Sequence, residues 1–437
     1  MPASISKAIH ETLTSEDDGR VCRDIPEEAC QEQPRNFTVH VASLTLTKAG
    51  DGLADPKLTL AWLLTALGAP AGMIGLLVPV REAGSLLPQL VTAGVLRKLP
   101  VRKWAWALGS VAQALALIGI AATAFTMEGP AAGAAIIGLL AVFAVARSVC
   151  SVTYKDVLGK TVSKATRGTA TGSAATASAG VVLAFGALLS FGIIPLTVPN
   201  VAIVLLVAAG CWLAAAALFA TLAEAPGSTE GGQSALRVAV RQVGLLRTDA
   251  PLRRFIVTRG LLTATALAPP YVLAMSGVDG DNGLGRLGPF LIASATASLV
   301  SSYIWGRMSD RSSRRVMILA GVIGAATMAG AAVAGLAGVG GATGLWLFPT
   351  LLFVLMIAHQ GVRVGRATHI VDMATEETRA AYTALSNTAI GVLLLAAGAT
   401  AAVAQRFGFE ATLLLFAGMS ALAALSATRL DEAQRED

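Results

Sequence analysis

The sequence is poor in charged and in aromatic residues. Of its 437 residues, 14% are Asp, Glu, Lys or Arg and 5% are Phe, Trp or Tyr, whereas 54% are hydrophobic. The mean hydropathy is +0.67. An ordinary soluble domain carries about 25% charged residues, so a chain this apolar could not cover its own surface with polar groups. The scarcity of charge excludes an ordinary soluble protein and indicates a polytopic membrane protein, which lipid covers.

Cysteine is also scarce, and the signatures of enzymes are missing. Cys22, Cys30, Cys150 and Cys211 are too widely spread to predict a disulfide framework. No His or further Cys completes a metal or redox site with Cys22 and Cys30, so we interpret these two as thiols of a polar tail. The sequence has no G-x-x-x-x-G-K-[ST] segment, so ATP is not the direct energy source. No Ser-His-Asp, Cys-His or zinc-type cluster is present, so we expect neither an enzyme nor a cofactor.

The start of the chain lacks the basic residues and short apolar core of a signal peptide. It is polar and acidic, and we predict a cytoplasmic tail over residues 1–35. The apolar segments that follow are long enough to cross about 30 Å of hydrocarbon. They are continuous and rich in Ala and Leu, without the alternation of barrel strands, and therefore predict helices. The expected spans are 37–67, 72–96, 103–126, 131–155, 168–194, 198–223, 253–276, 286–307, 315–338, 343–369, 379–404 and 409–429.

A polar stretch with Pro-Gly-Ser-Thr-Glu-Gly-Gly at 226–232 divides these spans into two sets of six. We therefore predict an all-α integral membrane fold of about twelve transmembrane helices. An N-terminal six-helix bundle covers 36–224, a cytoplasmic linker 225–250, a C-terminal six-helix bundle 251–430 and a cytoplasmic tail 431–437.

Basic residues lie in alternate loops, which orients the helices. Because Lys and Arg stay on the cytoplasmic side, both termini are predicted to be cytoplasmic and the chain to be a multi-pass protein of the cytoplasmic (inner) membrane. The net charge of +6 does not indicate nucleic acid, since the basic residues lie beside apolar helices. We expect a monomer whose partners are the lipid bilayer and a small-molecule solute. The basic loops hold Arg97, Lys98, Arg102, Lys103, Lys155, Lys160, Lys164, Arg167, Arg237, Arg241, Arg247, Arg253, Arg254, Arg311, Arg314, Arg315 and Arg379.

One of these loops carries a recognisable pattern. Residues 306–315 read G-x-x-x-D-R-x-x-R-R between two apolar spans. This pattern resembles the loop signature of the major facilitator superfamily of transporters, in which it links the second and third helices of each half. A glycine is usual in that family where Ser313 stands. A second departure lies in the fifth helix, because residues 180–192 lack the proline of the Gly-Pro-rich motif that drug/proton antiporters usually carry.

The two halves resemble one another weakly, as parallel six-helix repeats should. Residues 94–103 keep the first glycine and the final basic pair of residues 306–315. Arg147 precedes Asp156 by nine residues, and Arg363 precedes Asp372 by nine. Nine residues are two and a half helical turns, so each arginine is expected deep in its helix and each aspartate near the cytoplasmic mouth.

The resemblance implies two bundles around a central cavity that opens alternately to each side. It also implies a link between Arg147 and proton coupling. We expect the cytoplasmic loops to latch the bundles together when the cytoplasmic side is closed, with Asp310 pairing with arginines and a helix N-terminus. The predicted latch consists of Gly94, Arg102, Gly306, Asp310, Arg311, Arg314 and Arg315.

Charges within the spans suggest a functional site, because a charge at the bilayer centre is costly unless paired or hydrated. Lys48, Asp51 and Asp55 share one face of the first span, and Pro56 breaks a backbone hydrogen bond there. Asp51 has two interpretations: a structural ion pair with Lys48, or a proton or substrate role.

The second span carries the neighbours Arg81 and Glu82, which point about 100° apart on a helix. We expect one to reach the cavity and the other a neighbouring helix, with a salt bridge to the first span and a transport role both open. The proton-coupling candidates are Asp51, Glu82, Asp55 and Arg147.

The tenth span contains both deep and shallow polar residues. Arg366 and His369 are expected to snorkel to the interface, whereas His359 and Gln360 sit deeper; a core role for His359 remains open. Several arginines make the expected cavity net positive, and a guanidinium grips carboxylate or phosphate bidentately. The substrate-binding candidates are Arg81, Arg147, Arg259, His359, Gln360, Arg363 and Asn387.

The sequence therefore predicts a proton-coupled secondary active transporter for a small anionic or zwitterionic organic solute. One alternative is a proton antiporter that exports amphipathic or drug-like compounds. A second is a membrane assembly factor or receptor that keeps the fold without moving a solute.

Overall fold

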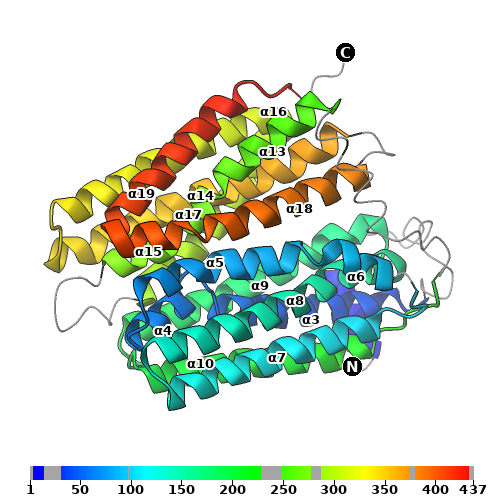
Figure 1. Ribbon diagram of the computed structural model, residues 1–437. Helices are drawn as coiled ribbons and strands as arrows, with labels where there is room; N and C mark the ends of the chain where they lie inside the picture. The colour runs from blue at the N-terminus through cyan, green and yellow to red at the C-terminus, as the bar shows by residue number, and fades with distance from the viewer. Residues whose placement is uncertain are drawn as a thin grey trace.

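The computed structural model describes residues 3–13, 31–96, 98–227, 244, 248–276, 287–374 and 379–432. Within these ranges the regular secondary structure is entirely helical (Figure 1). Cys22, Cys30, most of the predicted linker and the loop at 279–286 lie outside the described residues. In the first half the helices are α1 (Ala3–Leu13), α3 (Gln33–Leu53), α4 (Thr59–Ala66), α5 (Ala71–Leu86), α6 (Gln89–Leu96), α7 (Lys103–Thr126), α8 (Gly129–Thr161), α9 (Lys164–Ser190) and α10 (Val198–Ala220).

The second half repeats this arrangement. Its helices are α13 (Ala250–Leu262), α14 (Ala264–Leu267), α15 (Pro269–Met275), α16 (Leu287–Leu336), α17 (Gly341–Asp372), α18 (Arg379–Ala397) and α19 (Thr400–Ala427). In Figure 1 the second half lies above the first, and the marked chain ends lie at the same end of the molecule.

The number of spans agrees with the predicted fold. Within the described chain, nine helical segments are long and apolar enough to cross a membrane. The longest, α16, contains a non-helical residue at Ser312 and therefore counts as two spans. The broken pair α3 and α4 and the shorter apolar helix α18 complete about twelve. Large apolar side chains such as Leu108 and Leu425 are exposed, as a lipid-facing surface requires.

The first span of each half is broken near its middle. In the first half α3 ends at Leu53 and α4 begins at Thr59, so the predicted span 37–67 is two helices. Pro56 has no N–H to donate, and the Asp55 side chain accepts the Lys57 N–H instead, at 2.6 Å. In the second half the predicted span 253–276 is divided into α13, α14 and α15. These breaks leave polar backbone where the two halves face one another.

The two ends of the bundle differ in how the halves meet. We call the end next to the loops of Arg102, Lys160 and Arg311 the basic end, and the other the opposite end. At the opposite end small residues bring α9 against α16: a Cβ added to Gly288 would lie 2.7 Å from the Ser190 nitrogen and 2.8 Å from the Gly186 oxygen. Only glycine permits so close an approach of two backbones. The halves are therefore tightly closed at the opposite end.

Candidate functional site

A central cavity lies between the two halves. It consists of two adjoining parts with volumes of about 780 and 350 Å³. Both parts are lined by Asp51, Asp55, Lys57, His359 and Arg363. The broken span of the first half and helix α17 of the second half thus face each other across one cavity.

The cavity extends toward the basic end. Its larger part is lined by residues 172–182 of α9, 291–302 of α16 and 356–368 of α17. The stretch of α17 lies between mid-depth and the basic end, that of α9 spans the middle of its helix, and that of α16 runs from one turn inside the opposite end to just past mid-depth. The cavity is therefore central, it reaches toward the basic end along α17, and α9 and α16 approach closely beyond it at the opposite end.

Asp51 holds two arginines from two other helices. It accepts a hydrogen bond from Arg81 of α5 at 3.0 Å and pairs with Arg147 of α8. The Arg81 guanidinium also lies 5.0 Å from the centroid of the Phe143 ring. Of the two interpretations left open for Asp51, the structural ion pair with Lys48 is not found, because the two guanidiniums occupy the carboxylate. Asp51 therefore joins three helices of the first half.

A glycine next to Asp51 makes this arrangement possible. A Cβ at Gly50 would lie 3.0 Å from the Trp212 indole nitrogen and 3.2 Å from the Ala208 carbonyl oxygen. Gly50 thus lets α3 approach α10 closely. The Trp212 ring in turn lies 5.8 Å from the Arg147 guanidinium, within reach of a cation–π interaction.

Arg81 and Glu82 both line the smaller part of the cavity. The expectation that only one of them would reach it is wrong, because α5 lies along the interface and contacts α8 of its own half and α18 of the other. Two neighbouring side chains that point about 100° apart on α5 can therefore both face the cavity. Glu82 forms no ion pair with another residue of the described chain, whereas Arg81 is paired with Asp51.

A hydrogen-bonded chain crosses from one half to the other. Lys57 Nζ lies 3.2 Å from His359 Nε2, and His359 Nδ1 lies 3.2 Å from Thr265 Oγ1. Thr265 donates to the carbonyl oxygen of Leu262 at 2.9 Å. Sequence reasoning missed Lys57, although a lysine directly after an Asp-Pro break in an apolar span was a signal. His359 is thus a half-buried polar contact between the halves rather than an isolated core histidine.

Arg259 is held by neutral groups. Its guanidinium donates to Ser386 Oγ at 2.6 Å and to Asn387 Oδ1 at 2.9 Å, and the residue is 6% exposed. No carboxylate pairs with it in the described chain, and its Nε has no hydrogen-bond partner there. Asn387 also lies 3.4 Å from Gln89 of the first half. Arg259 is therefore a buried cation with one donor left over.

The cavity as a whole is net positive. Arg366 lines it, and His369 is 2% exposed with its Nδ1 2.9 Å from Ser313 Oγ, so the expectation that these two snorkel to the interface is wrong. Both lie on the face of α17 that turns to protein. The lining contains seven basic residues against three acidic ones, Asp51, Asp55 and Glu82. The basic residues are Lys48, Lys57, Arg81, Arg147, Arg259, Arg363 and Arg366, and Gln360 also lines the larger part.

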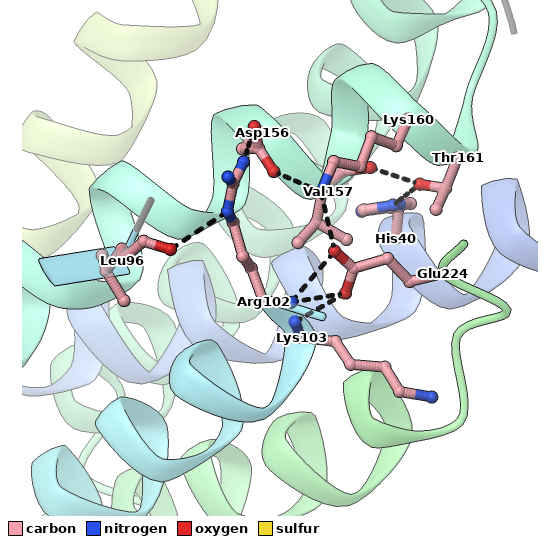
Figure 2. A network of polar contacts seen from close by, with 9 residues as sticks. All are labelled: His40, Leu96, Arg102, Lys103, Asp156, Val157, Lys160, Thr161 and Glu224. Carbon is pink, nitrogen blue, oxygen red and sulfur yellow. Dashed lines mark hydrogen bonds and ion pairs between the residues drawn. The ribbon is translucent and has the colours of Figure 1, made fainter. Parts of the chain in front are cut away.

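A second polar cluster lies at the basic end of the first half (Figure 2). Arg102 pairs with Asp156, and Lys160 pairs with Asp156 at 2.9 Å and with Glu224 at 3.2 Å. Glu224 also accepts backbone N–H groups of Arg102 at 3.0 Å and Lys103 at 2.7 Å, where α7 begins. A carboxylate there complements the helix dipole. The cluster fastens α7, α8 and the end of α10 together, and Glu224 was missed because it lies beyond the last span of its half.

We expect Glu224→Gln to destabilise the first half. The side chain is fully buried, and losing its charge weakens contacts with two backbone donors and an ammonium, which should lower the free energy of unfolding by about 2 kcal/mol. Thermal unfolding of the purified protein measures this. Glu128→Gln, at an exposed position, is the matched control and should change stability by less than ~0.5 kcal/mol. Equal effects would mean that the cluster does not stabilise the fold.

The corresponding segment of the second half is organised differently. Residues 306–315 form helix rather than a loop, broken only at Ser312. Asp310 is exposed and forms no ion pair within the described chain, so the contacts expected for it are not found in this conformation. Arg314 instead lies 3.4 Å from Glu432 and donates to the Leu430 carbonyl at 3.1 Å. Gly94 ends up in helix α6, and the latch role of these residues stays a prediction.

Comparison with known proteins agrees with this architecture. Residues 287–437 match the family model of the Major Facilitator Superfamily. The fold is similar to that of the nucleoside transporter NupG, with a TM-score of 0.66 and 13% identity over 90% of this chain and 99% of that chain. It is also similar to the inward-open xylose transporter XylE from E. coli, with a TM-score of 0.64 and 13% identity over 90% of this chain and 95% of that chain.

A POT family transporter in complex with a thioalcohol-conjugated peptide gives a TM-score of 0.67 at 10% identity, over 92% of this chain and 97% of that chain. At these identities the solved structures establish the fold alone. No curated protein sequence matches the chain.

Proposed function

We propose that this chain is a transporter of the major facilitator superfamily and that it moves a small anionic or zwitterionic organic solute across the cytoplasmic membrane. The transport is driven by the proton gradient and proceeds by alternating access. The observation that carries the proposal is the charge of the central cavity, in which seven basic residues face three acidic ones.

The arrangement of the cations supports an anion. Asp51 neutralises Arg81 and Arg147, which leaves Lys48, Lys57, Arg259, Arg363 and Arg366 without an ion pair in the described chain. A carboxylate or phosphate lowers the cost of holding these charges in the membrane and accepts charge-assisted hydrogen bonds from them. Arg259 is the strongest candidate to bind it, because its unused Nε donor is already buried.

The difference between the two ends of the bundle supports alternating access. In this conformation the halves touch at the opposite end and the cavity reaches toward the basic end. The second state closes the basic end and separates α9 from α16 as the halves rock about the cavity.

We expect Arg259→Gln to weaken anion binding about 10- to 150-fold, since hydrogen bonds to a charged group contribute about 1.5–3 kcal/mol. Purified protein is tested by thermal stabilisation with succinate, inorganic phosphate and glycine betaine, with xylose and tetraphenylphosphonium as uncharged and cationic probes. The probe that stabilises is then followed by counterflow in vesicles.

Two further variants control for folding and position. Arg259→Lys keeps the charge and should retain part of the affinity, whereas Arg254→Gln lies on the same helix at an exposed position outside the central cavity and should retain all of it. Stabilisation by tetraphenylphosphonium alone would favour the exporter of amphipathic compounds. Failure of the probes to bind or move would favour the assembly factor or receptor.

A further inference from the structure

His359 connects the two halves in a way that depends on its protonation. Lys57 can only donate, so His359 Nε2 accepts from it, and His359 Nδ1 carries the hydrogen toward Thr265 Oγ1. The Thr265 hydroxyl donates its own hydrogen bond to the Leu262 carbonyl oxygen, at 2.9 Å. In this series of hydrogen bonds every donor meets an acceptor, and this pattern requires His359 to be a neutral imidazole.

Protonation of Nε2 would break the contact. An imidazolium donates from both nitrogens and accepts from neither, so its new N–H would face the Lys57 ammonium directly. The contact joins the broken span of the first half to α17 of the second half. Loss of the contact therefore removes a connection between the halves at the depth of the cavity.

Cations surround the imidazole. Lys57 faces it from the α3–α4 break, and Arg363 and Arg366 face it from its own helix, while α14 contributes the neutral Thr265. Of the acidic groups of the cavity, Asp51 is paired with Arg81 and Arg147, Asp55 lies beside Lys57, and Glu82 on α5 lies among Arg81, Lys57 and Arg366. The positive charges of Lys57, Arg363 and Arg366 repel a further positive charge on His359. Protonation of His359 is therefore unfavourable until an anion enters the cavity.

We infer that His359 takes up the coupling proton, and that it does so together with the anionic solute. The inference rests on the proposed function, because the solute supplies the negative charge that balances the imidazolium. The proton passes from water on the open side to the Nε2 lone pair, no covalent bond to carbon changes, and the proton returns to water when the cavity faces the other side. Binding of the anion releases Lys57 from His359 and frees the halves to move.

This assignment differs from the carboxylates predicted as proton carriers. Asp51 has both of its oxygens occupied by Arg81 and Arg147, and a proton there would leave two guanidiniums without a counterion. An imidazole is the side chain whose charge ordinarily changes between pH 5 and 8. Coupling between the anion and the proton is reciprocal, so each strengthens binding of the other.

The test uses full-length protein and the solute that stabilises it, chosen from the anions succinate and inorganic phosphate and the zwitterion glycine betaine. In wild-type protein the affinity should rise as the pH falls, approaching tenfold per pH unit for one linked proton, and vesicles should take up protons with the anion. His359→Gln keeps an acceptor and a donor but cannot titrate. Its affinity for the solute should be the same at every pH, and it should take up no protons with the solute, while any remaining counterflow should also be independent of pH.

His369→Gln is the matched control, since it replaces the other histidine of α17, which contacts Ser313 outside the central cavity. It should keep proton uptake. Infrared difference spectra of the wild type should show imidazolium forming when the anion binds, and this measurement does not require a variant to fold. Proton uptake by His359→Gln, or binding of the anion to wild type without imidazolium formation, would overturn the inference and leave the anion transporter standing. Failure of the wild type to bind an anion would overturn both.

Discussion

Asp51→Asn should abolish transport and cost about 3 kcal/mol of stability, more than other single substitutions in the cavity. Asp51 is the shared partner of Arg81 and Arg147, and the Arg81 side chain is only 10% exposed. Removing one member of a buried pair leaves an uncompensated charge and typically costs 3–5 kcal/mol. The lower value applies here because the cavity hydrates Arg147, whose side chain is 33% exposed. Thermal unfolding in detergent and uptake into vesicles measure the two losses.

Asp55→Asn is the matched control on the same face of the same span. Asp55 accepts the Lys57 N–H at 2.6 Å, and an asparagine oxygen can accept the same hydrogen bond. Its stability should stay within about 0.5 kcal/mol of wild type. The double variant Asp51→Asn with Arg81→Gln should regain more than 1 kcal/mol relative to additivity, because the stranded cation is removed. A stable Asp51→Asn that loses proton-driven transport but keeps exchange would instead make Asp51 the proton carrier.

Gly288→Val should hold the opposite end open and reduce turnover by at least tenfold. Even a single Cβ at Gly288 meets backbone atoms, Ser190 N at 2.7 Å and Gly186 O at 2.8 Å. Overpacking of this kind costs about 1–3 kcal/mol, and the cost falls only on the state in which α9 and α16 touch. The ratio of the two states should therefore shift about 5- to 150-fold.

Spin labels at Phe191 and Ala342, in the first and second half at the opposite end, report the change as a longer distance. The control Gly180→Val lies on α9, the helix that Gly288 of α16 contacts, at a position where a Cβ meets nothing within 4 Å, and it should leave the distance and the turnover unchanged. An unaltered distance in Gly288→Val would show that the contact of α9 and α16 does not close the opposite end.

The fold could be predicted from sequence because lipid imposes strict rules on the backbone. Every peptide group within hydrocarbon must be hydrogen-bonded inside its own segment, so long apolar runs have to be helices. The two Arg-to-Asp pairs, 147/156 and 363/372, are each nine residues apart, and this spacing separated a deep arginine from a shallow aspartate. Local irregularity was harder to predict. The Asp55-Pro56 break was expected, whereas the segment 306–315 is helical because only Ser312 leaves the helical conformation.

The sequence by itself determined which residues are charged within the membrane, since apolar surroundings make each such residue conspicuous. Asp51, Glu82, Arg147, Arg259 and Arg363 were all recognised as intramembrane charges, and all line the cavity. Only the tertiary structure decided which groups these charged residues contact. Their partners come from helices distant in sequence, and a long side chain can reach any of several neighbouring groups. Spacing along one helix offered Lys48 as one possible partner of Asp51, but Arg81 of α5 and Arg147 of α8 pair with this carboxylate instead. The contact of Lys57 with His359 joins residues 302 positions apart, and no local pattern in the chain contains that information.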